Sequence, residues 1–218
     1  NVIIRVVRVA ADTTELCQGS AGLFEQKSKK ILIISSTLSP RFLMDLKTKA
    51  PENITIIDAP MSGATVAADK GTLTFMVGCE GKLFPYIEPL LRLMGAQINH
   101  IGNFGSGMMV KVLNNFIAAS SVVSVRHVLH QAQKFDLDIE KLFKTIDTSS
   151  GQTWFGTNRA SIEWFKESFE NNNTMGILTK DVLAYVDAFE NETEKDNFVD
   201  GQLSESIVKA LKNMPMVN

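Results

Sequence analysis

Two patterns of apolar and polar positions follow one another along the chain. In the first, short β-branched runs alternate with segments of helical periodicity; the runs are VIIRVV (2–7), ILIISS (31–36), ITIIDAP (54–60), GTLTFMVGC (71–79) and QINHIG (97–102). Each run has the length of a strand, and an uninterrupted apolar run is typical of a strand buried on both faces of a parallel sheet. The intervening segments predict helices at residues 11–26, 39–49 and 81–95. The first part is therefore predicted to be α/β.

From Ser106 onward the pattern predicts helices only. Residues 107–134 carry apolar side chains on nearly every face over roughly seven turns, which is typical of a helix buried in a domain or at an interface. Amphipathic segments follow at 138–149, 159–170, 178–190 and 203–213, and the polar segment 190–197 reads as a solvated connection. We predict a parallel-sheet domain at residues 1–104 and an all-α domain at residues 105–218.

Composition excludes several classes of partner. Apolar residues make up 44% of the chain and the net charge is −2, so nothing favours nucleic acid or an anionic membrane surface. We expect no membrane span, because the longest apolar run, FIAASSVVSV, ends at Arg126, well short of about 20 residues. Cys17 and Cys79 have no metal-ligand spacing and indicate a reducing compartment. We expect the cytoplasm, with the mitochondrial matrix as the alternative.

A lysine and an asparagine interrupt the apolar helical run. Lys111 and Asn115 are spaced i, i+4 and share one helix face, which also carries Gly107 one turn earlier. A lysine in an apolar wall can act as a proton donor, because desolvation lowers its pKa towards neutrality. The alternative is a lysine whose stem packs at the helix edge while its ammonium stays in water. The spacing alone favours this alternative.

Other polar groups lie where strands end or helices begin. The DAPMSGA segment (58–64) ends a strand, and its turn, with Ser62 and Gly63, can form a nest for a carboxylate; an ordinary loop is the alternative. Thr37 follows the second strand, at the edge where open parallel sheets bind ligands; a hydroxyl that only caps the strand end is the alternative. Lys180, with Asp181, opens a predicted helix; a lysine that points into a cleft there can meet a carboxylate or phosphate, but a solvated lysine on an exposed first turn is the more common case. His127 and His130 lack further ligands at a suitable spacing, so we expect no metal site.

Together, four segments resemble the β-hydroxyacid dehydrogenase family. They are DAPMSGATVAADKGTLTFMVG, HIGNFGSGMMVKVLNN, SSGQTW and LTKD, and the resemblance runs from about Val6 to Phe189. It implies a Rossmann-type domain, a long linking helix and an all-helical domain. Asn114 disfavours the decarboxylating 6-phosphogluconate dehydrogenases, which carry histidine there, and Lys111 disfavours the imine reductases, which lose this lysine.

The resemblance also implies roles for individual residues. Lys111 matches the catalytic lysine, which exchanges a proton with the substrate oxygen, and Asn115 matches the residue that orients it. Ser62 and Gly63 match the loop that binds the substrate carboxylate, where Ala64 replaces the usual second glycine. The positions that match cofactor contacts are Val9, Ala10, Thr14, Thr37 and Lys180. The cofactor implied is NAD or NADP.

The glycine-rich phosphate-binding fingerprint of the family is absent from the chain. The glycines of CQGSAG (17–22) lie within or after a helix, not between a strand and a helix. The first βαβ unit is therefore missing from residues 1–104, which form a partial Rossmann-type domain. We expect a further segment to precede Asn1, and the region after Phe189 departs from the family's usual ending.

These features predict an NAD(P)-dependent oxidoreductase that interconverts a small 3-hydroxy acid and its oxo acid or semialdehyde. The alternative is a cofactor-incompetent fragment or paralogue that acts as a dimerisation or binding module. A small carboxylate substrate is the expected partner. The long apolar helix favours a homo-oligomer, a dimer or a tetramer, since it has more apolar surface than one small helical domain covers.

Overall fold

A computed structural model describes residues 1–7, 9–189 and 201–217. The predicted polar connection at 190–197 lies outside these residues. The chain forms two compact units, Asn1–Leu113 and Asn114–Asn218, here called the sheet unit and the helical unit, and each is described by itself. The division between them falls inside the long helix α5 (Ser106–Lys134), which starts in the sheet unit.

The sheet unit contains a six-stranded sheet among its described residues. Its strands are β1 (Val2–Arg5), β2 (Lys30–Ile34), β3 (Ile54–Asp58), β4 (Met61–Ser62), β5 (Leu73–Gly78) and β6 (Gly95–Gly102). The order is β1-β2-β3-β5-β4, and β6 pairs with β5. β1, β2 and β3 run parallel, as predicted, with Ile4 opposite Ile33 and Ile33 opposite Ile57. The predicted α/β class, a Rossmann-like sheet followed by helices, is confirmed.

One part of the sheet differs from the predicted parallel arrangement. β5 is antiparallel to β3 and to β4, while β6 is parallel to β5. The reason is the short connection before β5: β4 and the six-residue helix α3 (Ala64–Asp69) turn the chain back on itself. Residues 63–72 join β4 to β5, fewer than the dozen or more residues that a parallel crossover needs. The brief β4 and α3 gave no periodic signal in the sequence.

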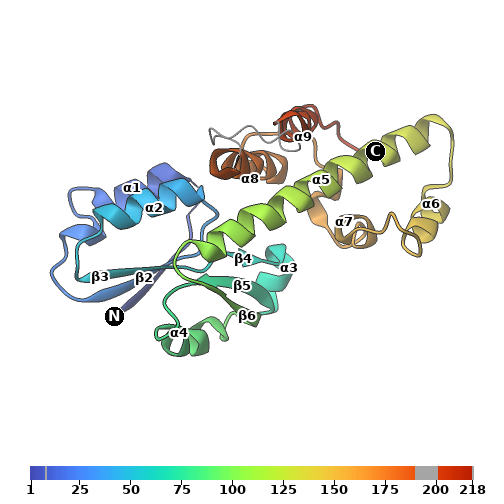
Figure 1. Ribbon diagram of the computed structural model, residues 1–218. Helices are drawn as coiled ribbons and strands as arrows, with labels where there is room; N and C mark the ends of the chain where they lie inside the picture. The colour runs from blue at the N-terminus through green and yellow to red at the C-terminus, as the bar shows by residue number, and fades with distance from the viewer. Residues whose placement is uncertain (8, 190–200, 218) are drawn as a thin grey trace. The chain divides into compact units, whose positions relative to one another are not determined.

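Helices cover both faces of the sheet (Figure 1). α1 (Ala10–Gln18) and α2 (Pro40–Lys49) bury Cys17, Leu43 and Leu46 against one face. α4 (Phe84–Leu91) buries Ile87 and Leu91 against the other face. Successive side chains of a strand point to opposite faces of the sheet, so β2 contributes to the apolar cores on both faces. Leu32 and Ile34 belong to the core under α1 and α2, and Ile33 belongs to the core under α4. α2 begins as predicted at Ser39-Pro40, where the Ser39 hydroxyl accepts from the Phe42 N–H.

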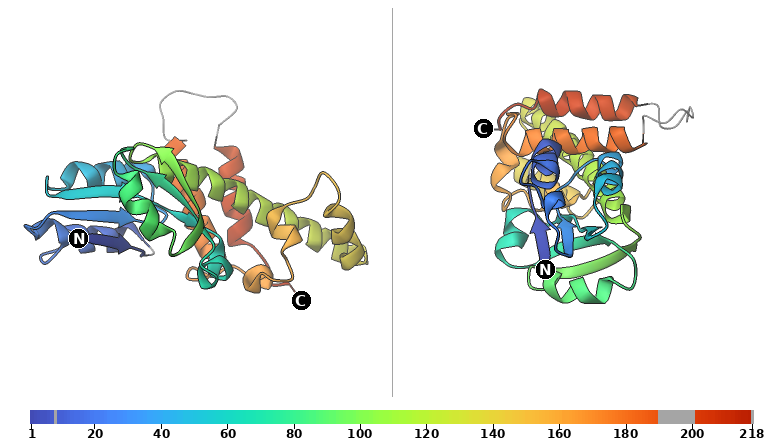
Figure 2. Two further views of the ribbon diagram at one scale, coloured as in Figure 1. Left: turned by 90° about the horizontal axis from the view of Figure 1, so that it is seen from below. Right: turned by 90° about the vertical axis from the view of Figure 1, so that its left-hand side faces the viewer.

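The helical unit packs around the second part of α5. Its further elements are α6 (Ile139–Ile146), α7 (Trp154–Thr157), α8 (Thr174–Phe189) and α9 (Gln202–Lys212), with α8 and α9 side by side (Figure 2). Residues 159–170, predicted as a helix, contain only a short 3₁₀ turn at Glu163–Lys166.

A buried arginine holds this irregular segment in place. Arg126 is 3% exposed and donates to the carbonyls of Phe165 and Glu167. These irregular carbonyls need such a donor because no helix satisfies them.

α5 is the one helix in the described part of the chain that is long and apolar enough to cross a membrane by length and composition. This corrects the expectation that no segment of the chain is long and apolar enough to span a membrane. The apolar helix continues past Arg126, whose side chain is buried in the helical unit. Core helices pass the same test. One side of α5 packs in a core: Ala119, Val122 and Leu129 contact the aromatic side chains of the helical unit.

Candidate functional site

The segment that ends β3 fixes the start of α5. Asp58 is 0% exposed, and its two carboxylate oxygens accept from the backbone N–H groups of Gly105 and Met108, each at 2.7 Å. The first N–H groups of a helix have no partner within the helix, and the positive end of the helix dipole favours a negative charge. Asp58 therefore caps α5 from a distant strand.

The approach of α5 to the sheet requires a missing side chain. A Cβ atom on Gly107 would overlap the carbonyl oxygen of Met76 and crowd the backbone nitrogen of Gly78, both on β5. Met108, the next residue, adds a further contact, because its sulfur accepts from the Leu38 N–H at 3.4 Å. Glycine at position 107 thus allows direct contact between helix and strand, the close approach that its spacing predicts.

Lys111 lies one helical turn beyond Gly107 and is 7% exposed. The alternative of a lysine whose ammonium lies on the surface does not agree with this burial. Ser62 reaches the same strand, because β4 pairs with β5 so that Ser62 lies opposite Thr74. Thr74 precedes the contacts of Gly107 by two to four residues, roughly 7–13 Å along a strand. The sheet unit thus brings the first turn of α5, which precedes Lys111, and the Ser62 loop to the same strand, β5.

Gly63 and Ala64 both have backbone conformations that favour glycine. Their φ angles are 134° and 56°, and a Cβ atom on Gly63 would overlap the side chain of Ala67. Ser62, Gly63 and Ala64 therefore form a sharp turn into α3, as a nest of N–H groups requires. Ala64 adopts the left-handed region at a cost that glycine would not have.

In the helical unit, Asn115 makes a short, buried polar contact. Its Nδ2 donates to Oδ2 of Asp181 at 2.6 Å, and the two residues are 8% and 4% exposed. Lys180 Nζ lies 3.1 Å from the other carboxylate oxygen of Asp181. The reading of Lys180 as part of an exposed first turn is wrong, because α8 begins at Thr174 and buries Asp181. The sequence analysis gave Asp181 no role, because its partner Asn115 lies 66 residues away in the chain.

The predicted cofactor residues of the sheet unit lie at the carboxyl ends of β1 and β2. Val9 is the N-cap of α1, and Ala10 and Thr14 follow on that helix, where the Thr14 hydroxyl donates to the Ala10 carbonyl at 3.2 Å. Thr37 follows β2 and is half-buried. α1 has no side-chain cap at its N-terminus.

Two buried polar side chains at this edge lack a hydrogen-bond partner among the described residues. They are the Arg5 guanidinium, at the end of β1, and the Ser35 hydroxyl, just after β2. Burial lowers the pKa of Arg5, and the nearby Cys17 and Asp12 counteract this shift only in part. Polar groups buried without partners are costly, and an acceptor from a ligand would satisfy them. This edge therefore fits a polar, anionic cofactor such as a dinucleotide.

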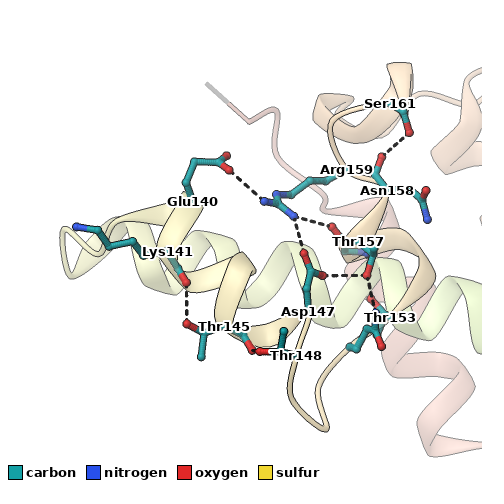
Figure 3. A network of polar contacts seen from close by, with 12 residues as sticks. Glu140, Lys141, Thr145, Asp147, Thr148, Thr153, Thr157, Asn158, Arg159 and Ser161 are labelled. Carbon is teal, nitrogen blue, oxygen red and sulfur yellow. Dashed lines mark hydrogen bonds and ion pairs between the residues drawn. The ribbon is translucent and has the colours of Figure 1, made fainter.

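An open cleft elsewhere in the helical unit is not the candidate site. It has a volume of about 460 Å³ and is lined by Glu140, Lys141, Lys144, Asp147, Thr148 and Arg159. Its least exposed cation, Arg159, is already paired with Glu140 at 3.1 Å and with Asp147 at 3.4 Å, as Figure 3 shows. Arg159 also lies over the Phe143 ring. These contacts join α6 to the turn after α7, which is a structural role.

Comparison with known families agrees with this arrangement. Residues 1–102 match the NAD binding domain of 6-phosphogluconate dehydrogenase, and residues 105–213 match the NAD-binding domain of NADP-dependent 3-hydroxyisobutyrate dehydrogenase. The chain belongs to the β-hydroxyacid dehydrogenase family. The second match passes Phe189 and reaches residue 213, which corrects the expectation that the resemblance ends there.

Individual relatives carry related names. The chain is 32% identical over 156 residues to a probable mitochondrial 3-hydroxyisobutyrate dehydrogenase of Dictyostelium discoideum, covering 71% of this chain and 49% of the relative. It is 34% identical over 159 residues to 2-(hydroxymethyl)glutarate dehydrogenase of Eubacterium barkeri, covering 72% and 52%. The chain thus spans about half the length of the curated relatives that it matches.

Among solved structures, 3-hydroxyisobutyrate dehydrogenase of Mycobacterium tuberculosis with L-serine has the same fold. The TM-score is 0.78 at 22% identity, and the match covers 99% of this chain and 76% of that one.

The strained alanine of the Ser62 loop gives a stability prediction. We expect Ala64→Gly to raise the free energy of unfolding by up to about 1 kcal/mol, because glycine adopts a φ of 56° without steric cost. Ala68→Gly, on the exposed side of α3, should lower it by about 0.5–1 kcal/mol. Urea unfolding followed by circular dichroism measures both, and a destabilised Ala64→Gly protein would contradict the strain.

The Asp58 cap predicts a pH dependence of stability. Burial raises the pKa of Asp58 from 3.8 to about 6, although the N–H groups of Gly105 and Met108 act to lower it. Between these values the folded protein keeps a proton that the unfolded chain has released, so stability falls as pH rises through this interval and is level above it. The contribution lost is about 3 kcal/mol at most.

Asp58→Asn lacks this titration. We therefore expect the difference in unfolding free energy between the wild type and this variant to decrease from about pH 4 to about pH 6 and then to stay constant. Asp45→Asn, which removes an exposed carboxylate of α2, is the control for lost charge. A difference that increases with pH would show that the pKa of Asp58 is not raised.

Proposed function

We propose that the protein is an NAD(P)-dependent oxidoreductase that interconverts a small 3-hydroxy acid and its oxo acid or semialdehyde. The observation that carries the proposal is the buried contact of 2.6 Å between Asn115 and Asp181, one helical turn beyond the buried Lys111. Membership of the family supports the reaction class. The names of the relatives, which refer to 3-hydroxyisobutyrate and 2-(hydroxymethyl)glutarate, support the substrate class.

In this proposal Lys111 is the general acid and base. During reduction its ammonium gives a proton to the carbonyl oxygen of the substrate, and during oxidation the neutral amine takes a proton from the hydroxyl group. The nicotinamide supplies or accepts the hydride when it is bound. Asn115, one turn away on the same helix face, orients the substrate oxygen towards Lys111.

Asp181 keeps Asn115 in the required amide orientation. Because Nδ2 of Asn115 donates to the Asp181 carboxylate, the amide oxygen is directed elsewhere and accepts from Nδ2 of Asn114 at 3.1 Å. The Ser62 hydroxyl and the N–H groups of Gly63 and Ala64 bind the substrate carboxylate. Lys180, with its side chain 36% exposed, binds the nicotinamide end of the cofactor.

The remaining cofactor contacts fall to Val9, Ala10, Thr14 and Thr37. The uncapped N-terminus of α1 and the unsatisfied donors of Arg5 and Ser35 support an anionic cofactor at this edge. They do not distinguish NAD from NADP.

The proposal is tested with the complete gene product and three probes, 3-hydroxyisobutyrate, 2-(hydroxymethyl)glutarate and L-serine, each with NAD⁺ and with NADP⁺. We expect turnover of at least one probe, and Lys111→Ala should reduce kcat by about 10²–10⁴-fold, because proton transfer loses its positioned group. Lys134→Ala, on the exposed end of α5, is the matched control and should leave kcat unchanged.

Near-normal turnover of the Lys111→Ala protein would exclude Lys111 as the acid–base group. Absence of turnover on every probe, together with no binding of NAD⁺ or NADP⁺ by calorimetry, would instead favour the non-catalytic dimerisation module.

We also propose that the protein is a homo-oligomer, a dimer or a tetramer. Large apolar side chains on α5 and α8 support this, since Ile117 is 70% exposed and Leu183 is 50% exposed. Large apolar side chains that gather on an exposed surface mark interfaces. Light scattering of the complete gene product should give a multiple of the monomer mass, and Ile117→Glu should lower that mass. A monomer at working concentration would contradict this proposal.

A further inference from the structure

One buried charge of the sheet unit has no role in the reaction proposed above. Asp58 is 0% exposed and touches the first turn of α5 through two hydrogen bonds of 2.7 Å. The donors, Gly105 and Met108, lie 47 and 50 residues further along the chain. Charge-assisted hydrogen bonds to a carboxylate are short and strong. These two fix the first turn of α5 against rotation about the helix axis and against translation along it.

The surroundings of Asp58 leave the helix little freedom. Gly107, between the two donors, contacts the backbone of β5 so closely that a Cβ atom would not fit. A Cβ atom on Gly78 would overlap Asp58 itself. Gly105 has a φ of 95°, which directs its N–H towards Asp58 before the helix begins. The carboxylate is thus enclosed by backbone from β3, β5 and α5.

Lys111 follows Met108 by three residues, so the two are neighbours on the helix surface. A rotation of the first turn of α5 would move the lysine with it. General acid–base catalysis depends on such placement, and an error of about 1 Å can reduce a rate by 10²-fold. An exposed N-cap could not hold the helix in this way, because water would compete for its N–H groups.

We propose that Asp58 is a positioning residue for Lys111, and that it acts by clamping the N–H groups of Gly105 and Met108. It touches neither substrate nor cofactor, and it exchanges no proton in the reaction. This inference rests on the proposed role of Lys111.

The test uses the complete gene product with 3-hydroxyisobutyrate, or with whichever of the three probes is turned over. Asp58→Asn keeps the size of the side chain but offers one acceptor in place of two. We expect kcat to fall by about 10- to 100-fold while KM changes by less than about threefold. The solvent deuterium isotope effect on kcat should rise, because proton transfer becomes more rate-limiting. Turnover is expressed per folded molecule, as measured by circular dichroism.

A milder variant covers the case in which Asp58→Asn does not fold. Gly105→Ala keeps both Asp58 and the N–H group but disfavours the φ of 95°, and it should reduce kcat by about threefold to tenfold with the same isotope signature. Gly71→Ala is the matched control: Gly71 also has a positive φ, 63°, but a Cβ atom there would meet only the Leu93 carbonyl oxygen, at 4.0 Å. It should leave kcat and the isotope effect unchanged.

Amide hydrogen exchange gives a readout that does not need activity. In Asp58→Asn and Gly105→Ala, exchange should accelerate from Gly105 to Val112, while β2 and β3 stay protected.

The outcomes separate the two hypotheses. If Lys111→Ala is inactive but Gly105→Ala and folded Asp58→Asn have normal kcat, the positioning role is wrong and the proposed function stands. An equal loss in Gly71→Ala, or a loss confined to KM, would also overturn the positioning role. Near-normal turnover of Lys111→Ala would instead overturn the proposed function.

Discussion

The carboxylate of Asp58, buried at the start of α5, is the contact on which the arrangement of the sheet unit depends. It joins the end of β3 to Gly105 and Met108 and so sets where the long helix begins. The same short segment continues into Ser62 and Gly63, which pair with β5 and turn into α3. One stretch of chain, residues 58–64, therefore fixes both the helix that carries Lys111 and the loop proposed to bind the substrate carboxylate.

Close packing at this point makes small residues necessary. Gly107 and Gly78 face backbone or carboxylate atoms at distances that no Cβ atom could share, while Gly63 and Ala64 need positive φ angles. The two requirements differ in their physical origin, since the first is steric exclusion by neighbouring elements and the second is the local backbone. Ala64 shows that the local requirement can be violated at a modest cost, whereas a side chain at Gly107 would have to displace β5.

The parts of the fold that could be predicted are those with a local signal. Strand-length apolar runs and helical periodicity gave the α/β class, and the i, i+4 spacing gave the shared face of Lys111 and Asn115. The roles of Asp58 and Asp181 could not be predicted, because their partners are 47 to 66 residues away in the chain. The direction of β5 was missed for a similar reason: it depends on a short β4 and α3 that carry no periodic pattern.

Two buried carboxylates, Asp58 and Asp181, bind α5 at two positions along its length. Asp58 binds its first turn, and Asp181 binds Asn115, so the stretch from Met108 to Asn115 that contains Lys111 is anchored at both ends. Losing one of these donors would leave a buried carboxylate oxygen unsatisfied, which is more costly than the loss of an exposed hydrogen bond. Sliding or fraying of this stretch is therefore opposed by electrostatics as well as by packing.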